Sequence, residues 1–446
     1  MSGRSAMAVA GDNLIYKKIG WRLVPFLLVC YMMAAIDRFN IGFAKLQFLH
    51  DLGLNNAVYG VAAGFFYVGY ISCEVPSNLW LARIGVRKTL LRIMVLWGGV
   101  TSLMMLAHSA YAFYILRFLL GVAEAGFFPG ILFYLTIWFP DRLRGRVTSL
   151  FVMAAPISGI VGGPLAGWVM ESFQGVYGLR GWQWLFLLEG IPAILLGVIA
   201  YFYLCDQPAS ASWLSAEEKR LVVEDINADR LRRPAKADKS FRGVLRDPKV
   251  YLMAIIYFAY FCSLNTYDLW SPSVMRAVGV QKVITIGWYS GITHLIGTAG
   301  MVAVGYSSDR HMERRWHVAL CGLTAAVCFM LLPLGSHSIG VTVLLLSIAA
   351  IGIYGVLGLF WTIPSAYLEQ GSAAAGGIAL ITSIGSLGGA VSPPLVGWIA
   401  VRTGSLYLGL SVIASFMIIG MVLLLLGMSR LVLSQNSREN ELGPQR

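Results

Sequence analysis

The sequence predicts an all-α polytopic membrane protein with twelve transmembrane helices in two pseudo-symmetric six-helix bundles. Apolar residues make up 57% of the 446 residues and charged residues 13%, whereas a soluble domain has about 45–50% and about 25%. Twelve apolar stretches are long enough to cross about 30 Å of hydrocarbon. Two sequence patterns also recur about 230 positions apart. These observations exclude an ordinary soluble domain.

Hydrophilic gaps separate the twelve predicted spans. The spans cover residues 20–43, 57–80, 88–108, 112–136, 147–170, 182–204, 251–275, 286–307, 316–335, 340–364, 373–400 and 405–430. One long gap divides the chain into an N-terminal tail (1–19), a first bundle (20–204), a central loop (205–250), a second bundle (251–430) and a C-terminal tail (431–446). In the loop, Ser215 and Glu218 form a capping-box pattern that predicts a short amphipathic helix.

The distribution of positive charge predicts the orientation of the spans. Of the 34 Lys and Arg residues, 27 lie in the tails and gaps on one side and five on the other, while Arg38 and Arg117 lie within spans. Cytoplasmic loops carry the excess of Lys and Arg, so both termini and the central loop are predicted to be cytoplasmic. Orientation and contact with membrane lipid therefore explain the net charge of +12, and no nucleic-acid partner is predicted.

The two bundles resemble each other in sequence. The motif GPLAGW at 163–168 in the fifth span corresponds to PPLVGW at 393–398 in the eleventh, an offset of 230 residues. The gap after the second span, with Arg83 and Arg87, likewise corresponds to the gap after the eighth, with Asp309 and Arg310. Duplication of six helices gives parallel repeats, which in secondary transporters place the substrate site between the repeats near mid-membrane.

The fourth span, read as one helix over 117–140, carries two opposite charges. Arg117 and Glu124 are seven residues apart, so both lie on one stripe of a helix. An ionisable group at membrane depth costs roughly 2.5 kcal/mol or more, so this stripe must face protein or water. Two interpretations remain open: a buried structural ion pair, or a polar transport site.

Polar residues also interrupt the first, second, seventh and eighth spans. Adjacent helical residues point about 100° apart, so we expect Arg38 to face a cavity and Asp37 to pair laterally. In the second span, Tyr70 could donate to an anion or form an ordinary interhelical hydrogen bond. In the seventh span, Asn265 and Tyr267 are plausible ligand contacts. The remaining polar residues are expected to have other roles: Asp268 at the ligand or at the outer rim, and His294 in packing or in a bond between helices. Glu189 and Glu369 are expected near helix ends, in interface or loop contacts.

Several motifs are absent from the sequence. It has no phosphate-binding loop of the Gly-x-x-x-x-Gly-Lys type, so it is not an ATP-driven pump by itself. It has no HExxH motif, and its six cysteines include no CxxC pair, so neither a metal site nor disulfides are predicted. We therefore expect no cofactor, no catalytic residues and no enzymatic activity.

Several long motifs resemble the major facilitator superfamily, and more closely its anion:cation symporter family of bacterial permeases for tartrate, phthalate, hydroxyphenylacetate and sugar acids. The resemblance covers essentially the whole chain. It depends on the runs DRFNIGFA (37–44), GY (69–70), EVPSN (74–78), RFLLGVAEAGFFPGILFYLTIWFP (117–140), GWQWLFLLEG (181–190) and AGGIAL (375–380). The expected fold is accordingly the major facilitator fold.

The resemblance implies roles for individual residues. Arg38 corresponds to the arginine that contacts the substrate carboxylate, and Tyr70 and Asn265 correspond to other residues of the substrate site. Asp37 and Glu124 correspond to the proton-coupling carboxylates, with Arg117 as their charge partner, and the gating loops would hold Arg83, Arg87, Asp309 and Arg310. The sequence departs from the family at Ala82, where an aspartate is usual, and at Thr382 and Ser386, where many relatives have asparagine. Thr382 is nevertheless included among the predicted substrate contacts.

These expectations combine into one functional prediction. The protein is predicted to import a small organic anion by proton symport with alternating access, as a monomer in the bacterial inner membrane. Sodium-coupled symport or anion exchange on the same fold is the alternative. A membrane receptor that binds a ligand without moving it is a more remote one.

Overall fold

The computed structural model describes residues 3–232, 241–335, 338–368 and 372–428, and within these ranges it contains helices and no strands. The helices of the first part are α1 (Gly3–Asp51), α2 (Asn56–Ile84), α3 (Val86–Leu103), α4 (Ala110–Glu124), α5 (Phe127–Trp138), α6 (Asp141–Val152), α7 (Ala154–Ser172) and α8 (Gly181–Tyr203). The central segment forms α9 (Ala216–Arg232) and α10 (Phe241–Leu245). The helices of the second part are α11 (Pro248–Ala277), α12 (Val283–His311), α13 (Arg315–Leu331), α14 (Ile339–Leu359), α15 (Thr362–Tyr367), α16 (Ser372–Thr403) and α17 (Leu406–Gly427). The predicted tail 431–446 lies outside the described residues.

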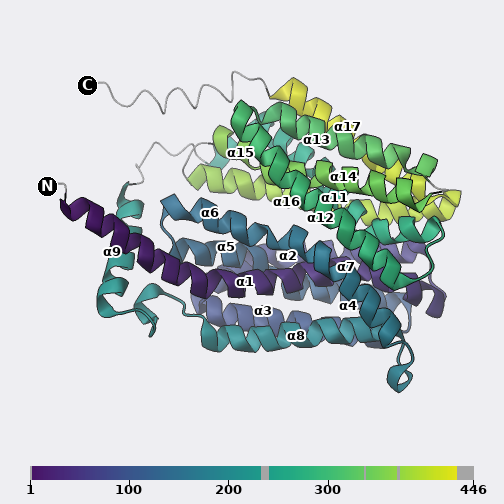
Figure 1. Ribbon diagram of the computed structural model, residues 1–446, viewed down its shortest axis with the longest axis horizontal. Helices are drawn as coiled ribbons and strands as arrows, with labels where there is room; N and C mark the ends of the chain where they lie inside the picture. Colours follow the sequence, from purple (N-terminus) through teal and green to yellow (C-terminus); the bar gives the residue numbers. More distant parts are fainter. Residues whose placement is uncertain (1–2, 233–240, 336–337, 369–371, 429–446) are drawn as a thin grey trace.

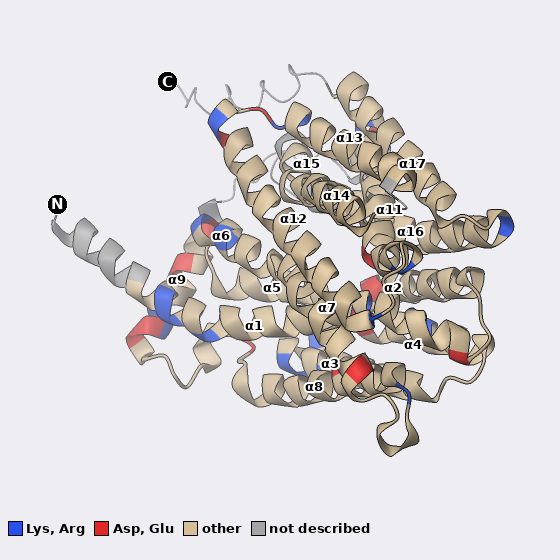
Figure 2. Ribbon diagram, turned by 45° about the vertical axis from the view of Figure 1, so that its right-hand side comes forward, with Lys and Arg blue, Asp and Glu red and all other residues tan. Residues whose placement is uncertain are grey.

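The helices form two bundles that lie side by side (Figure 1), with α1 to α8 in the first and α11 to α17 in the second. The bundles meet where α7 packs on α12 and α2 packs on α16. The short helix α9 lies at the end of the molecule that holds the N-terminus. Lys and Arg gather around α9, α6 and the part of α1 that passes α9 (Figure 2).

Eleven helical segments of the described residues are long and apolar enough to cross a membrane. The remaining predicted span, 286–307, falls within α12. This helix has 29 residues, so it extends about 43 Å and is long enough to cross. It is less apolar because its buried face is small and polar, with Ser290, Thr293, His294 and Thr298. Helix α1 begins at Gly3, so most of the predicted N-terminal tail continues the first span as helix.

The prediction of one helix over 117–140 is wrong at its centre. Helix α4 ends at Glu124, and α5 begins at Phe127. Gly126 lies between them with φ of 88°, a left-handed conformation that favours glycine. A Cβ at this position would also approach the Ser77 side chain to 2.5 Å. The chain therefore breaks immediately after the buried carboxylate, where the Ser77 side chain of α2 lies against Gly126.

The two bundles touch at the end of the molecule that is remote from the N-terminus. Here the Tyr59 hydroxyl donates to the Leu269 carbonyl at 3.2 Å, and the Ile284 amide donates to Glu171 at 3.0 Å. Gly167 permits this approach, because a Cβ on it would overlap the backbone of Ile284. We call this region the closed end.

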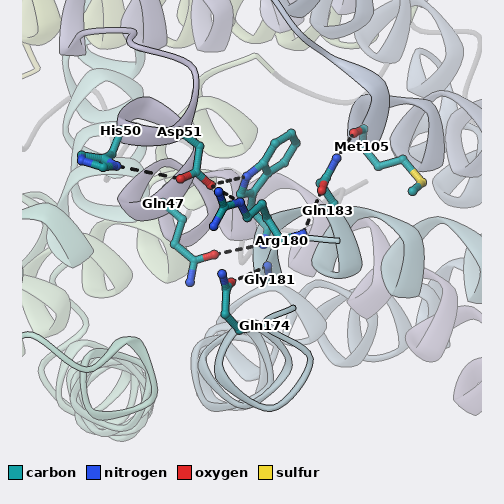
Figure 3. Close-up of polar contacts among 9 residues, drawn as sticks. Gln47, His50, Asp51, Met105, Gln174, Arg180, Gly181 and Gln183 are labelled. Carbon is teal, nitrogen blue, oxygen red and sulfur yellow. Dashed lines mark hydrogen bonds and ion pairs between the residues drawn. The ribbon is translucent and has the colours of Figure 1, made fainter. Parts of the chain in front are cut away.

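A polar network fixes the helix ends of the first bundle at the closed end (Figure 3). The Trp182 indole donates to the Asp51 carboxylate at 3.0 Å, and the Trp182 amide donates to the Gln47 side chain at 3.1 Å. The Gln183 side chain donates to the Met105 carbonyl at 2.8 Å. These bonds tie α1, α3 and α8 together, so the first bundle presents a fixed surface to the second.

Candidate functional site

The most prominent polar contact inside the first bundle joins α1 to α4. Arg38 Nε donates to Glu124 Oε1 at 2.8 Å, and Arg38 Nη2 lies 2.5 Å from the same oxygen. The Glu124 side chain is fully buried, whereas the Arg38 side chain is 24% exposed. The other carboxylate oxygen, Glu124 Oε2, has no hydrogen-bond partner among the described residues. The arginine is therefore the accessible member of the pair.

The second carboxylate on α1 points sideways, as the geometry of adjacent helical residues predicts. Asp37 accepts hydrogen bonds from the Thr101 hydroxyl at 2.9 Å and from the Trp97 indole at 3.1 Å, both on α3. It is 4% exposed. Two neutral donors thus hold this buried carboxylate beside the ion pair without neutralising it.

Arg117 does not form the ion pair with Glu124 that their shared stripe suggested. In the part of the chain that the structure describes, no ion pair involves Arg117, and its Nε lacks a hydrogen-bond partner. Its guanidinium lies over the Phe66 ring at 4.9 Å. Glu124 is therefore paired between helices and not along α4, because Arg38 reaches it from α1.

Two further predicted residues lie close to this cluster. The Arg38 guanidinium lies 5.2 Å from the centre of the Tyr70 ring, so Tyr70 borders the ion pair. Asn265 comes from the second bundle: it accepts a hydrogen bond from the Tyr67 hydroxyl of α2 and donates to the Phe261 carbonyl. The Tyr67–Asn265 bond joins the two bundles near the middle of α2 and α11.

Glu189 was expected near a helix end, and this expectation is wrong. It lies within α8 and is 5% exposed. Asn40 of α1 donates a hydrogen bond to its Oε1, while its Oε2 has no partner among the described residues. The sequence hides this contact because Glu189 follows an uninterrupted apolar run. The other glutamate in that prediction, Glu369, lies outside the described residues.

Other predicted site residues lie apart from the cluster. Tyr267 is 1% exposed and its hydroxyl donates to Thr293 of α12 at 2.8 Å, inside the second bundle. The Thr382 hydroxyl donates to the Ile378 carbonyl one turn back on α16, at 2.8 Å. Their roles in substrate binding remain predictions, because the structure brings neither of them to the Arg38–Glu124 pair.

The predicted gating residues contact their own bundles. The Arg87 amide donates to Asp206, and the Arg87 side chain donates to the Tyr201 carbonyl of α8. Asp309 pairs with Arg314 of the same bundle. Arg83 and Arg310 are exposed. Beyond the Tyr67–Asn265 bond, no hydrogen bond or ion pair within the described ranges joins the bundles at this end, which we call the open end.

Aromatic side chains that the prediction omitted extend from the cluster towards the open end. Tyr31 stacks on Phe151 with ring centres 4.7 Å apart, and Tyr257 of the second bundle stacks on Phe360 at 5.1 Å and lies 4.9 Å from Trp361. Tyr31 is seven residues before Arg38, and Tyr257 is eight before Asn265. Tyr31 and Tyr257 could have been predicted from their spacing, because residues seven or eight positions apart lie on the same side of a helix.

The geometry is that of a charged, partly accessible site between two repeated bundles, and a family comparison decides the class. The family model of the Major Facilitator Superfamily matches residues 27–393. The chain belongs to this superfamily. In the described ranges it has no group of three or more His, Cys, Asp or Glu side chains that could hold a metal ion.

Individual relatives and a solved structure agree with membership of the Major Facilitator Superfamily. The chain is 43% identical over 423 residues to "Putative metabolite transport protein NicT" of Pseudomonas putida, covering 95% of this chain and 96% of the relative. It is 42% identical over 429 residues to "Putative tartrate transporter" of Agrobacterium vitis, covering 96% of each. Its fold is similar to the crystal structure of a D-xylose–proton symporter, with a TM-score of 0.70 at 15% identity, covering 91% and 97% of the two chains.

Membership fixes the general role of the molecule. It is a multi-pass membrane transport protein, and a small molecule is its substrate. Within the first bundle, the Arg38–Glu124 pair combines a buried carboxylate with a partly accessible arginine.

Proposed function

We propose that the protein imports a small organic anion together with a proton, across the bacterial inner membrane, by alternating access. The observation that carries the proposal is the unequal exposure within the Arg38–Glu124 pair, 24% against 0%. A substrate carboxylate can reach the arginine and compete for it by charge-assisted hydrogen bonds. The glutamate behind it then loses its partner.

The loss of that partner links substrate to proton. An unpaired buried carboxylate is costly, and breaking a buried ion pair by removing one partner costs about 3–5 kcal/mol. Protonation removes the cost, so Glu124 takes up a proton when the substrate occupies Arg38. Linkage is reciprocal, so a proton on Glu124 strengthens substrate binding in turn. Asp37 and Arg117, held beside the pair, set the remaining charge balance of the cavity.

Hydrogen bonds join the bundles at the closed end, whereas beyond the Tyr67–Asn265 bond none among the described residues joins them at the open end. If both termini are cytoplasmic, as the positive charges indicate, the open end faces the cytoplasm and this conformation releases substrate inward. The relatives named for tartrate and metabolite transport favour a carboxylate. The aromatic rings beside Tyr31 and Tyr257 would suit a flat or aromatic acid.

Reconstituted vesicles with a pH-sensitive dye inside test the proposal. A panel of tartrate, sugar acids, phthalate, hydroxyphenylacetate and nicotinate is added outside, and the substrate should acidify the interior. The Glu124→Gln variant should lose pH-driven accumulation and keep substrate exchange, because the amide mimics the protonated acid. Entry of radiolabelled substrate without acidification would refute proton coupling. Sodium coupling or anion exchange would then be the remaining mechanisms.

A further inference from the structure

A second buried titratable pair lies in the second bundle, outside the site described above. Asp268 of α11 faces His294 of α12, with Oδ1 and Nε2 3.7 Å apart. The two side chains are 9% and 5% exposed, so Asp268 is not at the outer rim. Neither of the two facing atoms has a hydrogen-bond partner in the part of the chain that the structure describes.

The other ring nitrogen shows how many protons this pair holds. His294 Nδ1 lies 2.8 Å from the Ser290 carbonyl oxygen. A carbonyl only accepts, so Nδ1 carries the hydrogen and a neutral ring presents a lone pair on Nε2. An ionised Asp268 would then place two buried acceptors face to face, which is costly. One additional proton, on either Asp268 or Nε2, resolves the conflict.

In the described part of the chain, no neighbouring charged group compensates an ionised Asp268, so the additional proton must reside on Asp268 or His294. The titratable groups near Asp268 are tyrosines, which are neutral near pH 7: Tyr67, Tyr260, Tyr267 and Tyr354. No lysine or arginine forms an ion pair with Asp268 among the described residues. The parts of the first bundle that lie against the imidazole are Gly159 of α7 and Phe39 of α1, and neither carries a titratable group.

The pair is covered by the interface between the bundles. A Cβ on Gly159 would overlap the His294 ring, and the Phe39 ring centre lies 6.0 Å from the imidazole. Because α7 packs along α12, separating the bundles here would expose the pair to water. A solvated aspartate and histidine have usual pKa values of about 3.9 and 6.5. Above about pH 6.5 the exposed pair would therefore hold no additional proton.

We infer that Asp268 and His294 form a second proton-binding site, which takes up one proton when the α7–α12 interface closes and releases it when the interface opens. The inference rests on the alternating access proposed above, but it needs no proton to travel with the substrate. Linkage predicts that the ratio of open to closed interface rises up to about tenfold for each pH unit above about 6.5.

Hydrogen–deuterium exchange of the full-length protein in lipid nanodiscs, without substrate or gradient, tests this inference. Protection of peptides from α7 and α12 is measured from pH 5.5 to 8.5, after correction for intrinsic exchange. Wild type should lose protection above about pH 6.5. Asp268→Asn and His294→Gln each supply an amide donor in place of the proton, so both variants should stay protected at pH 8.5. His311→Gln, a change of an exposed histidine at the C-terminal end of the same helix α12, is the control and should keep the wild-type pH dependence.

The outcomes separate this inference from the proposed function. If protection of the wild-type interface does not change with pH, the inference is refuted without any variant. It is also refuted if Asp268→Asn and His294→Gln both keep the wild-type pH dependence. If the carboxylate panel fails to acidify vesicles while the exchange data follow the expected pattern, the symport proposal fails and the second proton site stands.

Discussion

The two bundles solve the burial of charge in opposite ways. In the first bundle, Arg38 and Glu124 form a direct ion pair, and two donors from α3 hold Asp37. In the second, Asp268 faces only His294 at 3.7 Å, among tyrosines. The two bundles therefore share a helix arrangement but differ in their buried charged residues. In the functions proposed above, the first bundle would exchange one anion for another at Arg38, whereas the second would hold or lose a proton at Asp268 and His294.

Replacement of Arg38 should give the largest loss of substrate affinity. It tests the comparison directly, because it removes the ion pair that distinguishes the first bundle from the second. Arg38→Gln leaves Glu124 buried without its cation and removes the group that would bind the substrate. At about 3–5 kcal/mol, substrate affinity should fall by about 10²–10⁴-fold. This loss of affinity is measured by equilibrium binding of the substrate to the purified protein. Arg83→Gln, a change of an exposed arginine, is the matched control, and equal losses in the two variants would refute the assignment.

The closed end offers the next largest effect. Gly167→Leu places a side chain against the backbone of Ile284, where even a Cβ overlaps. Overpacking costs about 1–3 kcal/mol, so the closed interface should lose about 5–150-fold in population. Transport in vesicles should fall while substrate binding persists.

Gly99→Leu is the control for this change, because a Cβ at Gly99 meets nothing within 4 Å. If Gly99→Leu impairs transport as strongly as Gly167→Leu does, the loss of transport comes from placing leucine within a helix and not from a disturbed interface between the bundles.

A smaller effect is expected where the two bundles share a polar contact. Tyr67→Phe removes the hydroxyl that donates to Asn265 and keeps the ring between Phe66 and Phe261. A hydrogen bond contributes about 0.5–1.5 kcal/mol net, so substrate affinity should change by about two- to tenfold. A loss as large as that of Arg38→Gln would show that both bundles contribute equally to the site, against the comparison drawn here.

The smallest effect concerns the central helix α9, which attaches to the first bundle. Lys18 donates to Glu218 at 2.8 Å, and this bond lowers the pKa of Glu218 from its usual range. A lowered pKa stabilises the fold above the usual carboxylate range near 4.3 and loses that contribution as the pH falls through the lowered value. The pair is partly exposed, so its contribution is under about 1 kcal/mol.

Thermal unfolding of Glu218→Gln measures this contribution. The variant should melt slightly below wild type at pH 7, and the two melting curves should converge on acidification. A difference that grows as the pH falls would contradict the sign derived from the pKa of Glu218.

The membrane class and the two-bundle fold were readable from the sequence, and so were the positions of several charges that the structure buries. Apolar length predicts a span without knowledge of its neighbours, because a helix satisfies its own backbone in hydrocarbon. A charge inside such a span is conspicuous, which is why Asp37, Arg38, Arg117 and Glu124 were found. The burial of Glu189 was missed because the sequence shows neither how far α8 extends before it nor which helices cover it.

Pairing was decided by the tertiary structure. The sequence places Arg117 and Glu124 on one stripe, yet Arg38 takes the glutamate, because α1 brings its guanidinium within 2.5 Å. The break at Gly126 depends on the approach of Ser77 from α2. Asp268 and His294, 26 residues apart on different helices, meet only when α11 and α12 pack. Helix periodicity fixes which way a side chain points, and only the packing of helices fixes what it meets.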